Sequence, residues 1–144
     1  MRISGTVSSG LGRAHVFMSQ KHYQSQFKAV LGVGAWPGTL NVDVGSSGIG
    51  EFSQLRVIAG LEEGDASEDV EALRIGGFER DGRSFGGATA FKSRIRVSDG
   101  EWEECAILIP DLTRHTSTAE VISGAFLRES LPCSDGDLVH IELN

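Results

Sequence analysis

The chain has 144 residues, 13 of them basic and 20 acidic, which gives a formal net charge of −7. This length predicts a single domain, spanning residues 1–144, with a hydrophobic core of its own. Because the acidic surface offers no basic field to a nucleic-acid backbone, the charge disfavours binding to DNA or RNA.

Nineteen glycines and short, punctuated apolar runs favour a mainly β fold in which helix is the minor component. Cys105 and Cys133 lack the spacing of a metal site, so we interpret them as reduced thiols. The chain starts directly in a strand-like pattern without an apolar signal core, and no apolar run approaches membrane-spanning length. We therefore expect a cytoplasmic protein with no membrane partner.

The first expected strand covers residues 2–8 and leads into a loop of small residues at 8–14, after which residues 15–18 are expected to form a second strand. Glycines in such a loop let backbone N–H groups approach an anion, and Arg13 would add further donors. The loop matches neither a Walker A sequence nor GxGxxG followed by a helix, so an ordinary turn remains the alternative.

An amphipathic helix is expected near residues 19–31. Ser19 is a suitable N-cap, and Gly32 is a suitable residue to end the helix. The apolar residues recur at i, i+4, i+7 and i+8, which is typical of one buried helix face: Tyr23, Phe27, Val30 and Leu31.

A proline-glycine turn then leads into a strand with two distinct faces. Its apolar residues alternate with oxygen-bearing ones: Leu40, Val42 and Val44 with Thr39, Asn41 and Asp43. A hydroxyl and an amide carbonyl side by side are suitable ligands for a small hard cation that takes further oxygens from a substrate phosphate. The alternative is a half-buried strand with a plain polar face, which the alternation describes equally well.

The middle of the chain is expected to be a loop at 45–50, a short strand at 52–58 and a solvated acidic segment at 62–69. A hairpin of residues 72–80 and 83–97 follows, because Asp-Gly at 81–82 is a strong two-residue turn signal. The glycines at 86–87 indicate a bulge or a close approach to the backbone. The unbroken apolar run at 105–109 predicts a central strand buried on both faces.

A polar, hydroxyl-rich segment at 111–120 follows that strand, and such a loop is a common place for ligand contacts. We then expect a strand at 121–122, a short helix near 125–131 and a final strand whose inward residues are Val139, Ile141 and Leu143. Turn chemistry alone explains Asp135-Gly136-Asp137, so we do not interpret this motif as a metal site.

The order of these motifs is more specific than any one of them. Along the chain come Gly10-Leu11-Gly12, Phe17-Met18-Ser19, Tyr23 with Phe27, Pro37-Gly38-Thr39-Leu40-Asn41, Gly77-Phe78, Arg83-Ser84-Phe85-Gly86-Gly87, Leu127-Arg128-Glu129 and Asp135-Gly136-Asp137. From about residue 3 to residue 143 this order resembles the archaeal CTP-dependent riboflavin kinase family, with only the 45–70 region lacking a clear counterpart.

The resemblance implies a six-stranded cradle-loop, riboflavin-kinase-like β-barrel with an amphipathic helix near residues 19–31 and a short helix near 125–131. It also implies transfer of the γ-phosphate of CTP to the 5′-hydroxyl of riboflavin, with Mg²⁺, to give FMN and CDP. We expect the protein to be a monomer. The alternative is a non-catalytic barrel that binds a flavin or a nucleotide, and a small-barrel interaction domain is a weaker third hypothesis.

Carried over by position, the resemblance implies that Thr39 and Asn41 bind magnesium and that Thr113 and Glu120 contact the flavin. The residues it implies for the nucleotide lie in two segments: Leu11, Gly12, Arg13, Ala14, His15 and Val16, and then Ala125, Phe126, Leu127 and Arg128. No general base is evident, and the candidates are Asp43, on the polar face of its strand, and Glu120.

One position departs from the family pattern, whose loop typically reads GxGxG. Here the third glycine is Ala14. If that position requires a positive φ, alanine costs about 1 kcal/mol or more, and the loop would sit differently on the triphosphate. The sequence therefore leaves open whether CTP or ATP is the preferred donor.

Overall fold

Six antiparallel strands close into a barrel in the computed structural model, which describes residues 1–10, 12, 14–66 and 69–143. The strands pair in the order β6-β7-β8-β2-β1-β9, and pairing between β6 and β9 closes the ring. The strands of the barrel are β1 (Arg2–Ser8), β2 (Leu40–Asp43), β6 (Ala88–Val97), β7 (Glu103–Pro110), β8 (Thr118–Ile122) and β9 (Leu138–Leu143). The six-stranded barrel predicted from the sequence is confirmed.

Every second side chain of the strands fills the barrel interior. On β2 and β9 the inward residues are at most 6% exposed: Leu40, Val42, Val139, Ile141 and Leu143. β7 is buried on both faces, because Ile107 belongs to the interior core whereas Ala106 and Leu108 pack with the buried residues of α2 (Lys21–Leu31). The predicted central strand is therefore confirmed.

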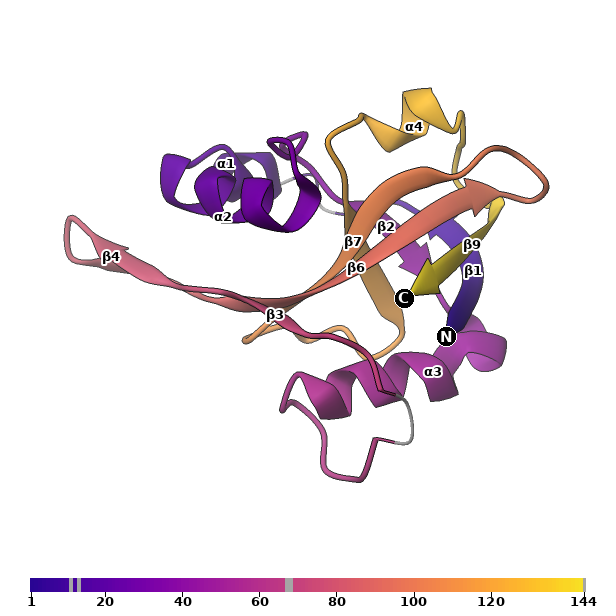
Figure 1. Cartoon of the computed structure of the whole chain (residues 1–144), viewed down its shortest axis with the longest axis horizontal. Helices are drawn as coiled ribbons and strands as arrows, with labels where there is room; N and C mark the ends of the chain where they lie inside the picture. The colour runs from indigo at the N-terminus through magenta and orange to yellow at the C-terminus, as the bar shows by residue number, and fades with distance from the viewer. Residues whose placement is uncertain (11, 13, 67–68, 144) are drawn as a thin grey trace.

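A two-stranded arm extends away from the barrel (Figure 1). β3 (Leu73–Ile75) pairs with the first part of β6, and the chain continues into β4 (Phe78–Arg80) and β5 (Arg83–Phe85), which pair with each other. Asp81 and Gly82 have φ of 52° and 75°, as the predicted two-residue turn requires. The expected hairpin is confirmed, with breaks at 76–77 and 86–87.

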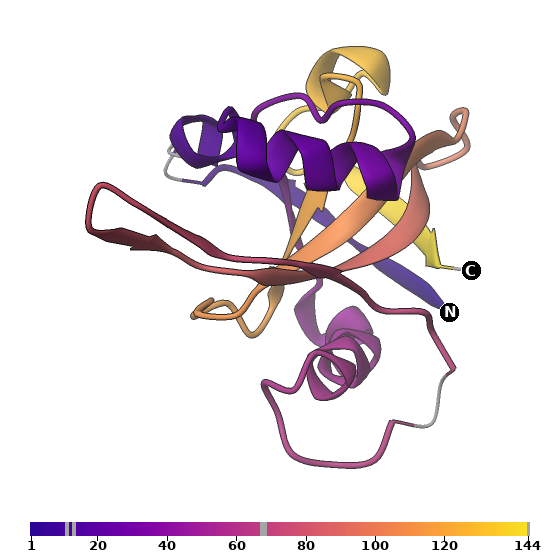
Figure 2. The same ribbon diagram turned by 60° about the vertical axis from the view of Figure 1, so that its left-hand side comes forward.

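α2 is the expected amphipathic helix, with Tyr23, Phe27 and Val30 buried against the outer face of β6 and β7 (Figure 2). Gly32, at φ 80°, ends the helix as predicted. The predicted start was wrong: the helix begins at Lys21, and Ser19 is not its cap. The Ser19 hydroxyl donates to the His15 carbonyl oxygen at 2.5 Å instead.

Residues 14–18 form a short helix, α1 (Ala14–Met18), so the strand expected there was wrong. Val16 and Phe17 are 59% and 46% exposed, and Met18 is the buried residue of the helix. Burial therefore does not alternate along this run. A short apolar run alone does not distinguish a helical turn from a strand.

A single helix, α3 (Gly45–Ile58), replaces the loop and strand expected at 45–58. Phe52 and Leu55, three residues apart, are buried in the barrel core. Gly48 permits close packing on β1, since a Cβ there would lie 2.9 Å from the Ser4 carbonyl oxygen. The glycines that suggested a flexible loop thus serve helix packing, at some cost in helix propensity.

α4 (Leu127–Ser130) is shorter than the helix expected near 125–131, and it lies at the end of the barrel opposite α3 (Figure 1). The acidic residues 62–66 are exposed, as expected for the segment 62–69, of which residues 67–68 lie outside the described part. Within the described ranges, no helix is long and apolar enough to cross a membrane.

Candidate active site

A row of polar side chains crosses the outer face of the barrel where β1, β2 and β8 are neighbours. In the pairing register Asn41 lies between Ser8 and Glu120. Paired residues share one face of a sheet, and their neighbours along the strand point to the other face. Because Leu40 and Val42 fill the interior, the polar row faces outward, and the predicted alternation of this strand is confirmed.

A polar cavity of about 840 Å³ lies over this row. It is lined by the end of β1, the glycine loop, Thr39 and Arg128. Gly10 lies so close to the Asn41 side chain that a Cβ at this position would collide with the amide nitrogen. Glycine therefore allows the loop backbone to reach the polar row.

An apolar cavity of about 580 Å³ adjoins the polar one, and this volume is typical of small-molecule sites. It is lined by α1, α2, the adjoining ends of β6 and β7, and the loop at 112–115 that follows β7. The two cavities share Ala14, Phe17, Thr39, His115 and Glu120. They therefore form one cleft, with a polar half and an apolar half that meet at these residues.

Two side-chain oxygens converge where the halves meet. The Thr39 hydroxyl donates to Asn41 Oδ1 at 3.2 Å. Adjacent ligands of octahedral magnesium, each roughly 2.0–2.1 Å from the ion, lie about 3 Å apart, so this pair fits one edge of such a site. No cluster of three or more His, Cys, Asp or Glu suited to a metal occurs in the described part of the chain. A cation here would take its other oxygens from water and a bound phosphate.

Of the two candidate bases, only Glu120 lines the cleft. Burial raises the pKa of its carboxyl group, and the nearby His115 acts in the opposite direction. Asp43 is exposed, and its Oδ1 accepts a hydrogen bond from the backbone N–H of Gly45 at 3.0 Å, at the start of α3. The structure therefore gives Asp43 a place at a helix terminus outside the cleft.

Two arginines hold the loop that follows β7. Arg74 donates to both carboxylate oxygens of Asp111, at 2.7 and 2.8 Å, and these hydrogen bonds lower the pKa of Asp111. Arg56 of α3 donates to the His115 carbonyl oxygen at 2.6 Å. The sequence indicated that this loop is a place for ligand contacts, but it did not indicate either arginine. Arg74 is 37 residues from Asp111 along the chain, and Arg56 is 59 residues from His115.

Aromatic side chains join the arm to the helices beside the apolar half. The Tyr23 hydroxyl donates to the Gly86 carbonyl oxygen at 2.6 Å. Phe85 stacks on Phe78 with ring centroids 4.6 Å apart and meets Phe17 edge-on at 6.4 Å. Burial raises the pKa of Tyr23, so the hydroxyl remains a donor at neutral pH. The arm is thus fixed against α1 and α2.

Comparison with known proteins identifies the family of this chain. A family model named CTP-dep_RFKase, with the description "Domain of unknown function DUF120", matches residues 7–143. The chain belongs to this CTP-dependent riboflavin kinase domain family.

Curated relatives named riboflavin kinase match nearly the whole chain. The relative from Thermoplasma acidophilum is 32% identical over 141 residues, that from Haloquadratum walsbyi 33% over 144, and that from Methanoculleus marisnigri 34% over 142. These alignments cover 98%, 99% and 98% of this chain but 56% of each relative. The chain therefore spans little more than half the length of the curated relatives it matches.

The residues that the family resemblance implied for the nucleotide are distributed over two neighbouring cavities. Gly12, Ala14, His15 and Arg128 line the polar half. Residues 125–127 line a smaller cavity of about 60 Å³, which also includes Thr39 and Arg128. Val16 is 59% exposed and lines none of these cavities. Two further predicted residues, Leu11 and Arg13, lie outside the described part of the chain.

The alanine that departs from the family pattern carries no backbone strain. Ala14 begins α1, and the described non-glycine residues with positive φ are Asp81 and Ser98. The cost considered for Ala14 therefore does not arise.

The two residues predicted to contact the flavin, Thr113 and Glu120, both line the apolar half. Two residues of the lining, His115 and Phe17, were not predicted from the sequence. His115 lies in the polar segment 111–120, where ligand contacts were expected, whereas Phe17 lies in the run 15–18, which was expected to form a strand.

Proposed function

We propose that this domain transfers the γ-phosphate of CTP to the 5′-hydroxyl of riboflavin, giving FMN and CDP with Mg²⁺. The observation that carries the proposal is the meeting of a polar and an apolar half-cleft at Thr39 and Glu120, in a chain of this family. The family name supports CTP as donor, and the name of the relatives supports riboflavin as acceptor.

The apolar half suits the flavin ring system. Phe17, Tyr23 and Phe27 offer aromatic and apolar surface, and Thr113 and Glu120 offer polar atoms at the wall that leads to the polar half. A flavin held in this way would direct its ribityl chain toward Thr39, where the two halves meet.

The polar half suits the triphosphate. The glycine loop approaches Asn41 closely, and the backbone N–H groups of such a loop can cradle phosphate oxygens. Arg128 adds a planar set of donors from α4. The donor phosphate and the acceptor hydroxyl would then be held next to each other, and positioning is the main requirement of phosphoryl transfer.

Thr39 and Asn41 would hold Mg²⁺ through their side-chain oxygens, which fit one edge of its coordination sphere. Magnesium supplies neutralisation of the charge on the phosphate oxygens. A Glu120 carboxylate oxygen would orient the 5′-hydroxyl and accept its proton as the new O–P bond forms and the bond between the γ-phosphorus and the CDP oxygen breaks.

A product assay tests the proposal. Purified protein is incubated with riboflavin and Mg²⁺ together with CTP, ATP, UTP or GTP, and FMN is separated by chromatography. We expect FMN with CTP. No FMN with any donor would contradict the proposal, and tight flavin binding without turnover would instead support a non-catalytic flavin-binding barrel.

We also propose that residues 1–144 form a single domain and act as a monomer in the cytoplasm, without nucleic acid or membrane. Light scattering after size-exclusion chromatography tests the oligomeric state, and an elution mass of a dimer would contradict it.

A further inference from the structure

A carboxylate outside the predicted nucleotide segments connects two of the walls of the polar half. Asp135 Oδ2 accepts a hydrogen bond from the Ser9 hydroxyl, and Asp135 Oδ1 accepts one from Arg128 Nη2 at 2.7 Å. Arg128 Nη2 also donates to the Ser8 carbonyl oxygen at 3.4 Å. Asp135 thus joins the glycine loop at the end of β1 to the arginine of α4.

The turn that carries Asp135 is itself fixed to β1. The Gly136 N–H donates to the Val7 carbonyl oxygen at 2.8 Å, and the Val7 N–H donates to the Asp137 carbonyl oxygen at 2.9 Å. The Asp137 side chain accepts from the Ser134 N–H at 2.9 Å. Gly136 has φ of 92°, which favours glycine. Asp135 is therefore presented from a defined turn.

Arg128 keeps donors for a ligand while it is bound in this way. It lines both the polar half and the small cavity beside it. Its contacts with the described residues use Nη2, and neither Nε nor Nη1 makes a hydrogen bond to them. A guanidinium held through one nitrogen can present its remaining N–H groups to phosphate oxygens in a fixed orientation.

We propose that Asp135 is a positioning residue for the nucleotide: it orients Arg128 and holds Ser9, at the start of the glycine loop, beside that arginine. This inference rests on the proposed function. The Asp135 side chain is 54% exposed, so solvent weakens its repulsion of the phosphates, whereas the geometry that it imposes on Arg128 is retained.

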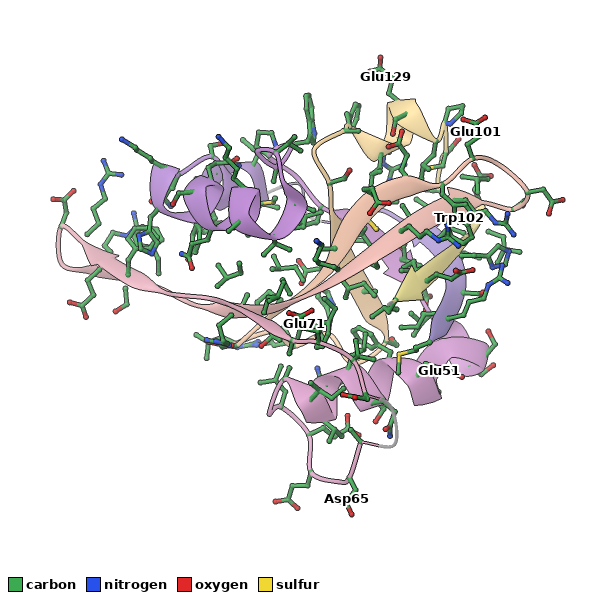
Figure 3. The ribbon with its side chains drawn as sticks, viewed as in Figure 1. Glu51, Asp65, Glu71, Glu101, Trp102 and Glu129 are labelled. Atoms are coloured by element: carbon green, nitrogen blue, oxygen red, sulfur yellow. The ribbon has the colours of Figure 1, made fainter. Side chains whose placement is uncertain are left out.

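The test compares Asp135→Ala and Asp135→Asn with two matched controls. Asp137→Asn removes the other negative charge of the same turn but keeps a side-chain oxygen that can accept from the Ser134 N–H, so the turn that presents Asp135 is retained. Glu129→Gln changes the residue that follows Arg128. The Glu129 side chain points away from the barrel (Figure 3). The readouts are KM for CTP, kcat, the Kd of riboflavin from quenching of its fluorescence, and Tm.

We expect Asp135→Ala to raise KM for CTP about tenfold, with kcat and the riboflavin Kd changed by less than about threefold, because only the nucleotide wall is loosened. Asp135→Asn should have a smaller effect in the same direction, since an amide oxygen can still accept from Arg128. Both controls should stay within about twofold of the wild type. A riboflavin Kd that rises together with KM for CTP, or controls that behave like Asp135→Ala, would contradict the inference.

A double variant separates positioning from a structural role. If Asp135 acts through Arg128, adding Asp135→Ala to Arg128→Ala should raise KM for CTP by less than Asp135→Ala does in the wild type, and the remaining effect reflects the lost hydrogen bond from Ser9, whereas fully additive effects would contradict the inference. Wild-type protein that makes no FMN would overturn the proposed function together with this inference. Active wild type with an unchanged Asp135→Ala would overturn the inference alone.

Discussion

The two halves of the cleft are built in different ways. The apolar half rests largely on helices and strands, with buried side chains of α2 and β7 packed against each other, and the loop after β7 completes its wall. The polar half rests on loops joined by a few hydrogen bonds, such as that between Arg128 and Asp135, whose side chains are 34% and 54% exposed. Packing energy is spread over many contacts, whereas a loop depends on few groups. Changes in the polar half should therefore alter nucleotide use at little cost in stability, and changes in the apolar half should alter both flavin binding and stability.

The largest effect is expected where the halves meet. Thr39→Ala and Asn41→Ala each remove an oxygen from the predicted magnesium edge, so kcat should fall by about 100-fold or more in steady-state assays of FMN formation.

Thr39→Ser keeps the hydroxyl and serves as the matched control, and it should retain most of the activity. Thr39→Ala with kcat close to that of the wild type would exclude the predicted metal site.

A smaller effect is expected in the apolar half. Tyr23→Phe removes the donor to the Gly86 carbonyl oxygen and loosens the arm, so unfolding free energy should fall by about 1 kcal/mol and the riboflavin Kd should rise several-fold. Denaturant unfolding and fluorescence quenching measure the two quantities.

Ser25→Ala is the matched control, because Ser25 is exposed on the same helix and its hydroxyl donates to the His22 carbonyl oxygen within that helix. KM for CTP should change in neither variant. If Tyr23→Phe raised KM for CTP as much as the riboflavin Kd, the two halves would not be independent.

The smallest effect is expected at the pair that holds the loop after β7. The hydrogen bonds from Arg74 lower the pKa of Asp111, so the stability that this pair contributes is present above the ordinary carboxyl pKa and is lost as pH falls through the lower pKa of the folded state. Asp111→Asn should reduce the free energy of unfolding by less than about 1 kcal/mol at neutral pH, because both side chains are partly exposed.

The difference between Asp111→Asn and wild type should shrink as pH falls below about 4. Denaturant unfolding at several pH values measures it, with Asp65→Asn as the control, since Asp65 points into solvent away from the barrel (Figure 3). A difference that grows as pH falls would contradict this assignment.

Local patterns predicted the strands and turns well. Alternation located β2 and β9, the Asp-Gly pair located the arm, and the unbroken run at 105–109 located the doubly buried β7. The same reasoning failed at α3, where glycines indicated a loop although Gly48 is a contact point with β1. It also failed at α1, where apolar composition indicated a strand.

The site residues were predicted from the order of motifs, because their local patterns also fitted ordinary strands and turns. The structure brings Thr39, Asn41, Glu120 and Arg128 to one cleft, and it leaves Val16 and Asp43 outside it. No local pattern indicates that Asp135 contacts Ser9, since the two residues are 126 positions apart. Such contacts depend on the pairing of β1 with β9, which brings the two ends of the chain together.

If phosphate passes between the two halves of one cleft, a label in the γ-phosphate of CTP should reach the flavin. The most direct measurement uses CTP radiolabelled in its γ-phosphate, with riboflavin, Mg²⁺ and the purified protein. We expect the label to appear in FMN and unlabelled CDP to accumulate in equal amount. Label found only in CTP and inorganic phosphate, with riboflavin unchanged, would contradict it.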